Sequence, residues 1–268
     1  MIKKSIYILL FLSITVSCKN TNKTPKSNVM VKESPSIKNG ESLIIAMHKR
    51  HNKNASKYIT FDQRTIYYDT NTGKVTKREM WHEAISRPGK LHFRFGDFST
   101  GNGFMYLDGH LFFIKENKIT NEKFDRFNEW TVLCHDVYLQ NPKKTIDIVK
   151  TKLKVNLNVL YETTWKGRSV YVVGAKKGDY KSNQFWIDKE HLYLVRNITL
   201  RDNGQYGDVR YIDYKKFGNE WIEGGLIVYY DKKLFLEEYY ENTRTHKRLD
   251  DKLFDPKNFS STSHFFDN

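Results

Sequence analysis

The sequence has few of the features that define several large classes of protein. Only two of its 268 residues are cysteine, too few for a disulfide framework, and only five are proline. No apolar run approaches the roughly 20 residues that a membrane-spanning helix needs. Aromatic residues make up 15% of the chain and hydrophobic residues 39%, more than a disordered chain would contain. The composition therefore excludes collagen, a coiled coil, a disulfide-rich miniprotein and a polytopic membrane protein, and it leaves a β-rich globular protein.

Motifs for catalysis and metal binding are also missing. No HExxH, GxSxG or SxxK motif occurs, and the glycines at 101–103 precede strand-like residues instead of the helix of a dinucleotide site. His48 and His51 stand three residues apart on a predicted helix, but no further Cys or His pattern completes a metal site. Asp188 and Glu190 fall in a predicted turn, where acidic residues are common. We therefore expect a protein that is not an enzyme and that has no metal and no cofactor.

The first 17 residues have the layout of a secretory signal peptide. Two lysines precede an apolar run at 6–16 that is too short to span a bilayer. The run ends in the sequence TVSC at 15–18, which resembles the bacterial lipobox. The resemblance implies cleavage after residue 17, attachment of a diglyceride to the sulfur of Cys18, and acylation of its new amino group, for example by palmitate. Three acyl chains would hold the protein firmly in a membrane.

The residues after Cys18 predict a tether and a destination. Residues 18–38 contain five lysines, many small polar residues and no aromatic residue, which is typical of a flexible linker. Lys19 follows the cysteine where an Asp would signal inner-membrane retention, so the lipoprotein resemblance implies an outer membrane lipoprotein that faces the periplasm. Exposure on the cell surface is left open by the sequence.

The chain is basic, with a formal net charge of +14. A basic surface generally favours polyanions. Because the leader predicts export, we expect no nucleic-acid partner, and anionic lipid headgroups are the favoured polyanion. A soluble surface with a basic bias and no polyanionic partner is an equally good interpretation.

The pattern of apolar residues after the tether predicts a β-rich body with a few helices. Residues 41–51 carry one apolar helical face, with Asn39 as the N-cap. Residues 130–138 have the stripe of an amphipathic helix, and a second helical stretch covers 143–152. The predicted strands cover residues 58–68, 79–85, 91–95, 104–107, 111–115, 118–124, 157–164, 168–175, 184–188, 192–201, 206–217, 220–230 and 233–245. Short turns such as Asp108-Gly109 join them, so antiparallel meanders are expected.

Several of these strands are apolar on both faces. A sheet with one face in water should alternate cleanly between apolar and polar residues, and the runs 104–107 and 111–114 do not alternate. We therefore expect a sheet that is covered on one side and available to a guest on the other. No linker or internal repeat appears between residues 39 and 268.

The order of these segments resembles a known family. The tether, the first helix, the GNG and Asp108-Gly109 turns, WTVLCHDVYLQNP at 130–142, NQFWIDKEHLYLVR at 183–196 and LFDPKNF at 253–259 resemble the outer-membrane lipoprotein-sorting group of the LolA/LolB-like superfamily. The resemblance implies an α+β, mainly β fold, a curved antiparallel half-barrel sheet whose concave face is covered by a few helices. It implies a single domain over residues 39–268 and a non-catalytic, carrier-like function, in which acyl chains of a lipoprotein or lipid enter an apolar cavity.

A cavity for acyl chains needs an apolar lining rather than a catalytic constellation. The candidates for that lining are Trp81, Phe93, Phe95, Phe104, Tyr106, Phe112 and Ile114. The alternative function is an envelope stress or lipid sensor on the same fold, which acts through a protein partner in the envelope. Cys134 lies on the apolar face of a predicted helix and is expected to be an inert core thiol.

Overall fold

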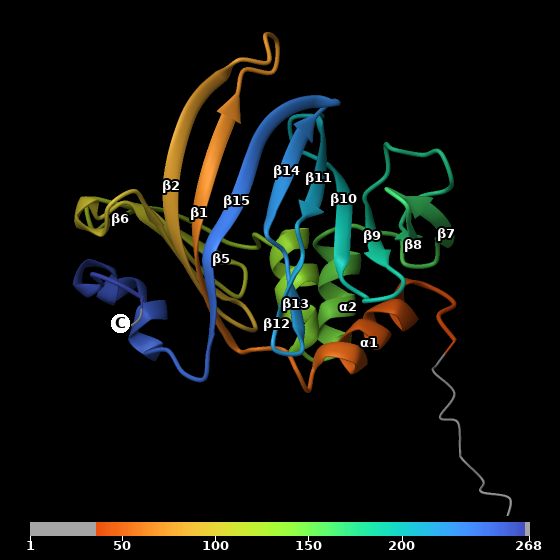
Figure 1. Cartoon of the computed structure of the whole chain (residues 1–268), viewed down its shortest axis with the longest axis horizontal. Helices are drawn as coiled ribbons and strands as arrows, with labels where there is room; N and C mark the ends of the chain where they lie inside the picture. The colour runs from red at the N-terminus through yellow and green to blue at the C-terminus, as the bar shows by residue number, and fades with distance from the viewer. Residues whose placement is uncertain (1–35, 266–268) are drawn as a thin grey trace, which may run out of the picture. The chain divides into compact units, whose positions relative to one another are not determined.

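One antiparallel sheet of thirteen strands organises residues 36–265, the part of the chain that this computed structural model describes. The strands follow the order β6-β5-β4-β3-β2-β1-β15-β14-β11-β10-β9-β8-β7 across the sheet (Figure 1). They are β1 (Tyr58–Tyr68), β2 (Val75–Ser86), β3 (Lys90–Phe95), β4 (Gly103–Leu107), β5 (His110–Lys115), β6 (Lys118–Lys123), β7 (Leu160–Trp165), β8 (Arg168–Val173), β9 (Gln184–Asp188), β10 (Leu194–Leu200), β11 (Tyr206–Ile212), β14 (Gly225–Tyr230) and β15 (Lys233–His246).

The sheet is curved and does not close, because β6 and β7 end the order at opposite edges. Two meanders meet where β15, the last strand, inserts between β1 and β14. A small separate hairpin, β12 (Lys215–Phe217) and β13 (Glu220–Ile222), interrupts the chain between β11 and β14. The expected mainly β half-barrel is therefore confirmed. The predicted leader, Cys18 and most of the predicted tether lie outside the described residues.

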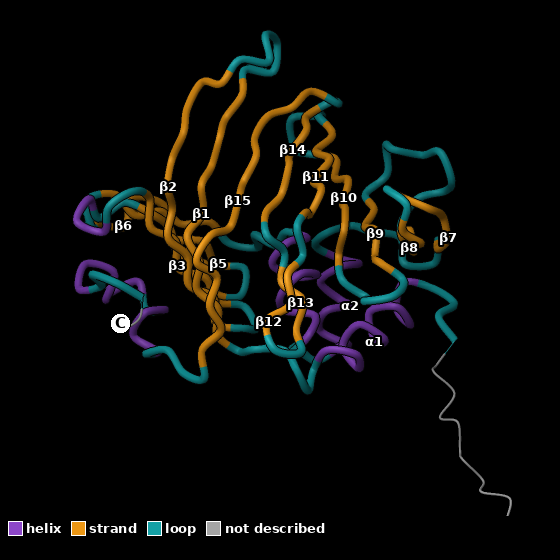
Figure 2. Tube along the Cα trace, viewed as in Figure 1, coloured by secondary structure: helices purple, strands orange, loops and turns teal. Residues whose placement is uncertain are grey.

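The helical segments are short, and most pack on one face of the sheet (Figure 2). They are α1 (Gly40–His51), α2 (Pro142–Thr151), the π-helical turn η2 (Trp130–His135), and the 3-10 turns η1 (Phe98–Thr100), η3 (Asp136–Tyr138), η4 (Asp251–Phe254) and η5 (Pro256–Ser261). None of the helices within residues 36–265 is long and apolar enough to cross a membrane.

Helix α1 begins where the sequence predicts. The side chain of Asn39 accepts a hydrogen bond from the backbone N–H of Ser42 at 2.9 Å, and Ser42 Oγ accepts one from the backbone N–H of Asn39 at 3.0 Å, which completes a capping box. Leu43, Ile44 and Met47 are fully buried on the face that the spacing predicts.

The central segment differs from the predicted α-helix. It forms the π-helical turn η2 and the 3-10 turn η3, and the backbone N–H of Asp136 bonds to the carbonyls of both Thr131 and Val132. Every residue from 131 to 138 is buried. An apolar stripe reports burial of one helical face, so it says little about helical pitch in a segment that is buried on all sides.

The main core joins these helices to one half of the sheet. Side chains of α1, η2, η3 and α2 pack with residues of β8, β9, β10, β11 and β14 in one buried apolar cluster. Figure 1 shows α1 and α2 beside this half, with the C-terminal turns at the other end of the sheet.

The C-terminal segment covers the opposite face of β3, β4 and β5. His92 Nδ1 bonds to the carbonyl of Leu253 at 2.6 Å, and the buried ring of Phe259 packs with Met105 and Ile114. Side chains alternate between the two faces of a strand, so Leu91 and Phe93 point to the other side. This cover explains why these strands are apolar on both faces.

Candidate functional site: a cavity on the inner face of the sheet

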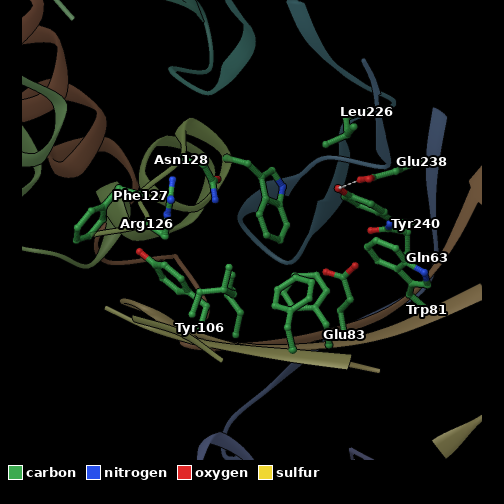
Figure 3. Close-up of a pocket in the computed structure, with 15 residues that line it drawn as sticks. Gln63, Trp81, Glu83, Tyr106, Arg126, Phe127, Asn128, Leu226, Glu238 and Tyr240 are labelled. Carbon is green, nitrogen blue, oxygen red and sulfur yellow. Dashed lines mark hydrogen bonds between the residues drawn. The ribbon is translucent and has the colours of Figure 1, made fainter. Parts of the chain in front are cut away.

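A cavity of about 410 Å³ lies on the helix-bearing side of the sheet, between strands β1–β5 and the segment that leads into η2. Leu226 of β14 belongs both to the helix-packed core and to the cavity lining, so the core and the cavity share one face. The lining residues, drawn in Figure 3, are Gln63, Trp81, Glu83, Leu91, Phe93, Phe104, Tyr106, Leu111, Arg126, Phe127, Asn128, Trp130, Leu226, Glu238 and Tyr240. The volume falls within the range of about 300–1,000 Å³ that is usual for ligand sites.

Four of the seven residues predicted from the sequence stand in this wall: Trp81, Phe93, Phe104 and Tyr106. Phe93 and Phe104 stack with ring centroids 4.0 Å apart, and Trp81 meets Phe93 edge-on at 6.4 Å. Rigid aromatic rings of this kind give a large apolar surface at a low cost in conformational entropy. The wall is thus suited to an apolar guest.

The other three predicted residues lie elsewhere. Phe95 is on the same face and packs against the neighbouring aromatic cluster, but it is not among the lining residues. Phe112 and Ile114 belong to the opposite face, where they pack with Met105 and Phe259 beneath the C-terminal segment. The expectation that Phe112 and Ile114 face the cavity is wrong, because the register of β4 and β5 places both residues on the opposite face of the sheet.

The cavity has a polar end that the sequence analysis missed. Glu83 of β2 is completely buried, and neither of its carboxyl oxygens has a hydrogen-bond partner. Glu238 of β15 accepts a hydrogen bond from the Tyr240 hydroxyl at 3.2 Å, drawn dashed in Figure 3. Gln63 completes this end, and its amide donates to Thr65 Oγ1 at 2.8 Å. A signal was present in the sequence. Glu83 stands two residues after Trp81 on β2, and residues two apart on a strand point to the same face.

Burial changes the protonation of both acids. It raises the pKa of Glu83 well above the usual range, and the charges of Glu238 and Glu223 raise it further. Burial also raises the pKa of Glu238 to about 7, against the opposing hydrogen bonds from Tyr240 and Gln63. Burial therefore favours the protonated, neutral form of Glu83, and Glu238 is near the midpoint of its titration at neutral pH.

A buried network of hydrogen bonds and ion-pair contacts positions Trp130, which lines the cavity. The indole N–H of Trp130 donates to Glu223 at 2.7 Å, and His135 Nε2 lies 3.2 Å from the same carboxylate oxygen. Arg87, at the end of β2, donates to His135 Nδ1 at 2.9 Å and pairs with Glu220. Because arginine can only donate, His135 Nδ1 is the acceptor and its proton sits on Nε2, toward Glu223. The network joins the sheet to the η2 turn that carries Trp130.

The groups considered for metal binding or catalysis have structural contacts. His51 Nε2 bonds to the carbonyls of His191 and Leu192, and Asp188 accepts from Arg168 and from the backbone of its own turn. Residues 36–265 contain no group of three or more His, Cys, Asp or Glu side chains that could hold a metal ion. Burial raises the pKa of the Cys134 thiol well above its usual value, so this thiol is not activated as a nucleophile.

Comparison with known proteins identifies the fold. No protein-family model and no curated protein matches the sequence. Among solved structures, an outer membrane lipoprotein-sorting protein domain from Vibrio parahaemolyticus aligns with a TM-score of 0.57 at 13% identity, over 82% of this chain and 98% of that one. The chain has the LolA-like fold.

Two further structures share the LolA-like fold of this chain. A LolA superfamily protein from Nitrosomonas europaea aligns with a TM-score of 0.52 at 11% identity, over 82% of this chain and 98% of that one. A DUF1329 family protein from Desulfovibrio piger aligns with a TM-score of 0.52 at 13% identity, over 81% and 95% of the two chains. These identities are low, so the likeness concerns the fold, and the function has to be argued from the cavity.

The titration of Glu238 gives a testable effect on stability. Its pKa in the folded protein, about 7, lies above the usual value of 4.5, so the stability it contributes is complete below pH 4.5 and is lost as the pH rises through 7. Replacing Glu238 by Gln removes this loss. We expect Glu238→Gln to be more stable than the wild type at pH 8 by up to about 3 kcal/mol, and to gain nothing at pH 4.

Urea unfolding of both proteins at pH 4, 6 and 8 measures this difference directly. Glu241→Gln is the matched control, because Glu241 is on the same strand but exposed. A stability gain for Glu238→Gln that does not change with pH would contradict the raised pKa.

Proposed function

We propose that this protein is a lipid-anchored protein of the bacterial cell envelope that binds acyl chains of a lipoprotein or lipid in the cavity, without catalysis. The observation that carries the proposal is the aromatic cavity of about 410 Å³ on the inner face of a LolA-like sheet. Each methylene that leaves water for such a wall contributes about 0.8 kcal/mol, so ten of them contribute on the order of 8 kcal/mol before the costs of association.

The proposed location has two supports. The leader and the lipobox-like sequence before Cys18 favour export and acylation, and the structural neighbour from Vibrio is named for outer membrane lipoprotein sorting. An anchored protein does not diffuse across the periplasm, so we favour reception or retention of an acyl ligand at the membrane over shuttling.

A pair of phenylalanines tests the proposal. Phe104 and Phe112 lie on neighbouring strands and are both partly buried, but Phe104 faces the cavity and Phe112 faces the C-terminal segment. We expect Phe104→Ser to weaken binding of a fluorescent fatty-acyl probe at least tenfold, because the lost apolar contact of one ring is worth about 1.5–3 kcal/mol. Phe112→Ser should bind the probe as the wild type does.

Fluorescence titration of the two variants, with their unfolding curves measured in parallel, gives the answer. Equal losses of probe binding in both variants, or no saturable binding by the wild type, would overturn the proposed function.

A further inference from the structure

The polar end of the cavity is not explained by acyl binding alone. An alkyl chain offers no hydrogen bond, yet Glu83 lies in the wall fully buried with both carboxyl oxygens unpartnered. Buried polar groups in folded proteins nearly always have partners, and leaving one without a partner costs free energy. Figure 3 shows the carboxyl group of Glu83 directed into the cavity. This carboxyl group therefore points to a ligand that carries a matching polar group.

The surroundings of Glu83 favour a cation as that group. A second acid, Glu238, lines the same end, and its charge makes ionisation of Glu83 more costly. The one cationic side chain in the lining, Arg126, lies on the far side of the cavity in Figure 3 and pairs outward with Asp202 at 3.8 Å. Two acids with no basic residue beside them form a site of negative potential once either one ionises.

The remaining polar groups at this end do not neutralise the acids. The hydroxyl of Tyr240 and the amide of Gln63 are neutral, and the indole N–H of Trp81 is buried without a partner. The nearby carboxylate of Glu223 is already engaged by Trp130 and His135. A positive charge is therefore what this end of the cavity lacks.

We propose that the cavity binds an amphiphile with a positively charged amine next to its alkyl chain, the amine sitting between Glu83 and Glu238. This inference rests on the proposed acyl-binding function and specifies the chemical class of its ligand. The charge of a primary ammonium beside Glu83 favours the ionised form of this acid. The ammonium donates up to three hydrogen bonds, enough to pair both Glu83 oxygens and reach Glu238. Bonds between an ammonium and a carboxylate are also stronger than bonds between neutral groups. A fatty-acid carboxylate would instead bring a further negative charge to this acidic end.

Three ligands of equal chain length test the inference: decylamine, decanol and decanoate. Each is titrated against the full-length protein at pH 8, by displacement of a fluorescent acyl probe and by calorimetry. We expect decylamine to bind at least tenfold more tightly than decanol, and decanoate to bind more weakly than either. In Glu83→Gln, a near-isosteric neutral variant, the preference for decylamine over decanol should fall below threefold while decanol binds as before.

Glu241→Gln makes the same change of net charge on the exposed side of β15 and should keep the full preference for the amine. If Glu83→Gln does not fold, Glu238→Gln carries the same prediction. Decanol binding without any preference for decylamine, or a preference that survives in the cavity variants, would overturn the inference and leave acyl binding intact. Failure of all three ligands to bind would overturn the proposed function and this inference together.

Discussion

Replacing Arg87 by Met is expected to lower the free energy of unfolding by about 3–5 kcal/mol. Arg87 is almost fully buried, and its guanidinium pairs with Glu220 and donates to His135 Nδ1 at 2.9 Å and to the Ser56 carbonyl at 3.3 Å. Methionine fills much of the same space but leaves the carboxylate of Glu220 buried without its cation. It also releases His135, which positions Glu223.

Equilibrium unfolding in urea measures the effect, and Arg64→Met is its control. Arg64 forms an ion pair with Glu241 at 3.0 Å in which both side chains are more than 40% exposed, so its loss should cost less than about 1 kcal/mol. Similar losses of unfolding free energy in the two variants would show that the buried network does not hold the η2 turn, which carries Trp130, to the sheet.

Replacing Phe259 by Ala is the second change with a large expected effect, a loss of about 3–5 kcal/mol. The ring of Phe259 is buried, stacks on His92 with centroids 4.8 Å apart, and lies 3.6 Å from the guanidinium carbon of Arg94. Arg94 is itself buried and donates to the carbonyls of Phe259 and Thr262. Truncating the ring therefore leaves a cavity beside a buried cation, at the contact that fastens the C-terminal segment to the sheet.

The measurement for Phe259→Ala is thermal and urea unfolding, together with limited proteolysis of the C-terminal segment. Phe124→Ala is the control, because Phe124 is 67% exposed and its replacement should change stability by no more than about 0.5 kcal/mol. If Phe259→Ala is as stable and as protease-resistant as Phe124→Ala, the C-terminal segment does not stabilise the outer face.

The hairpin of β4 and β5 shows how much more the sequence could have predicted. The Asp108-Gly109 turn was expected and is confirmed, with Leu107 paired to His110. A two-residue turn fixes the register of the whole hairpin, and residues directly opposite each other share a face. Phe112 is therefore opposite Met105 and Ile114 is opposite Gly103, on the face away from Tyr106. Apolar character alone predicts Phe112 and Ile114 in the cavity, whereas the register of the hairpin places them on the opposite face.

Gly103 lies on the same face as Phe112 and Ile114, and close contacts on this face explain why the position has no side chain. A side chain at this position would come within 3.0 Å of the ring of Phe259 and would collide with the backbone carbonyl of Phe93. Only glycine permits this approach of β4 to its neighbours. The sequence shows the glycine but not its reason, because the contacting residue comes from the C-terminal segment, far along the chain.

Two long predicted strands are each divided in the structure. The predicted run 206–217 becomes β11 and β12, separated near Asp213, whose φ is +52°. The run 220–230 becomes β13 and β14, separated by Glu223 and Gly224, and β14 begins at Gly225 with φ +155°. Strand propensity identifies the residues of such a run, but the bend depends on the local backbone conformation. A positive φ is uncommon for a residue other than glycine, so Asp213 alone does not locate the bend in the sequence.

The polar end of the cavity needed the tertiary structure. Glu83 could be placed on the inner face of β2 by alternation. Glu238, however, comes from the last strand, β15, which pairs with β1 although the two strands lie near opposite ends of the described sequence. Local patterns carry no information about such a long-range pairing. The raised pKa values of the two acids follow from their burial together and not from any motif.

Native mass spectrometry of the full-length protein, extracted from bacterial membranes without denaturation, shows whether the cavity holds an acyl ligand. Acylation of Cys18 would add mass that survives collisional activation, whereas a guest in the cavity would add mass that is lost on activation. We expect a fraction of the wild-type protein to carry such a releasable ligand with an alkyl chain, and Phe104→Ser to carry less of it. A wild-type protein that never carries such a ligand, and that does not bind added fatty-acyl probes, would contradict acyl binding in the cavity.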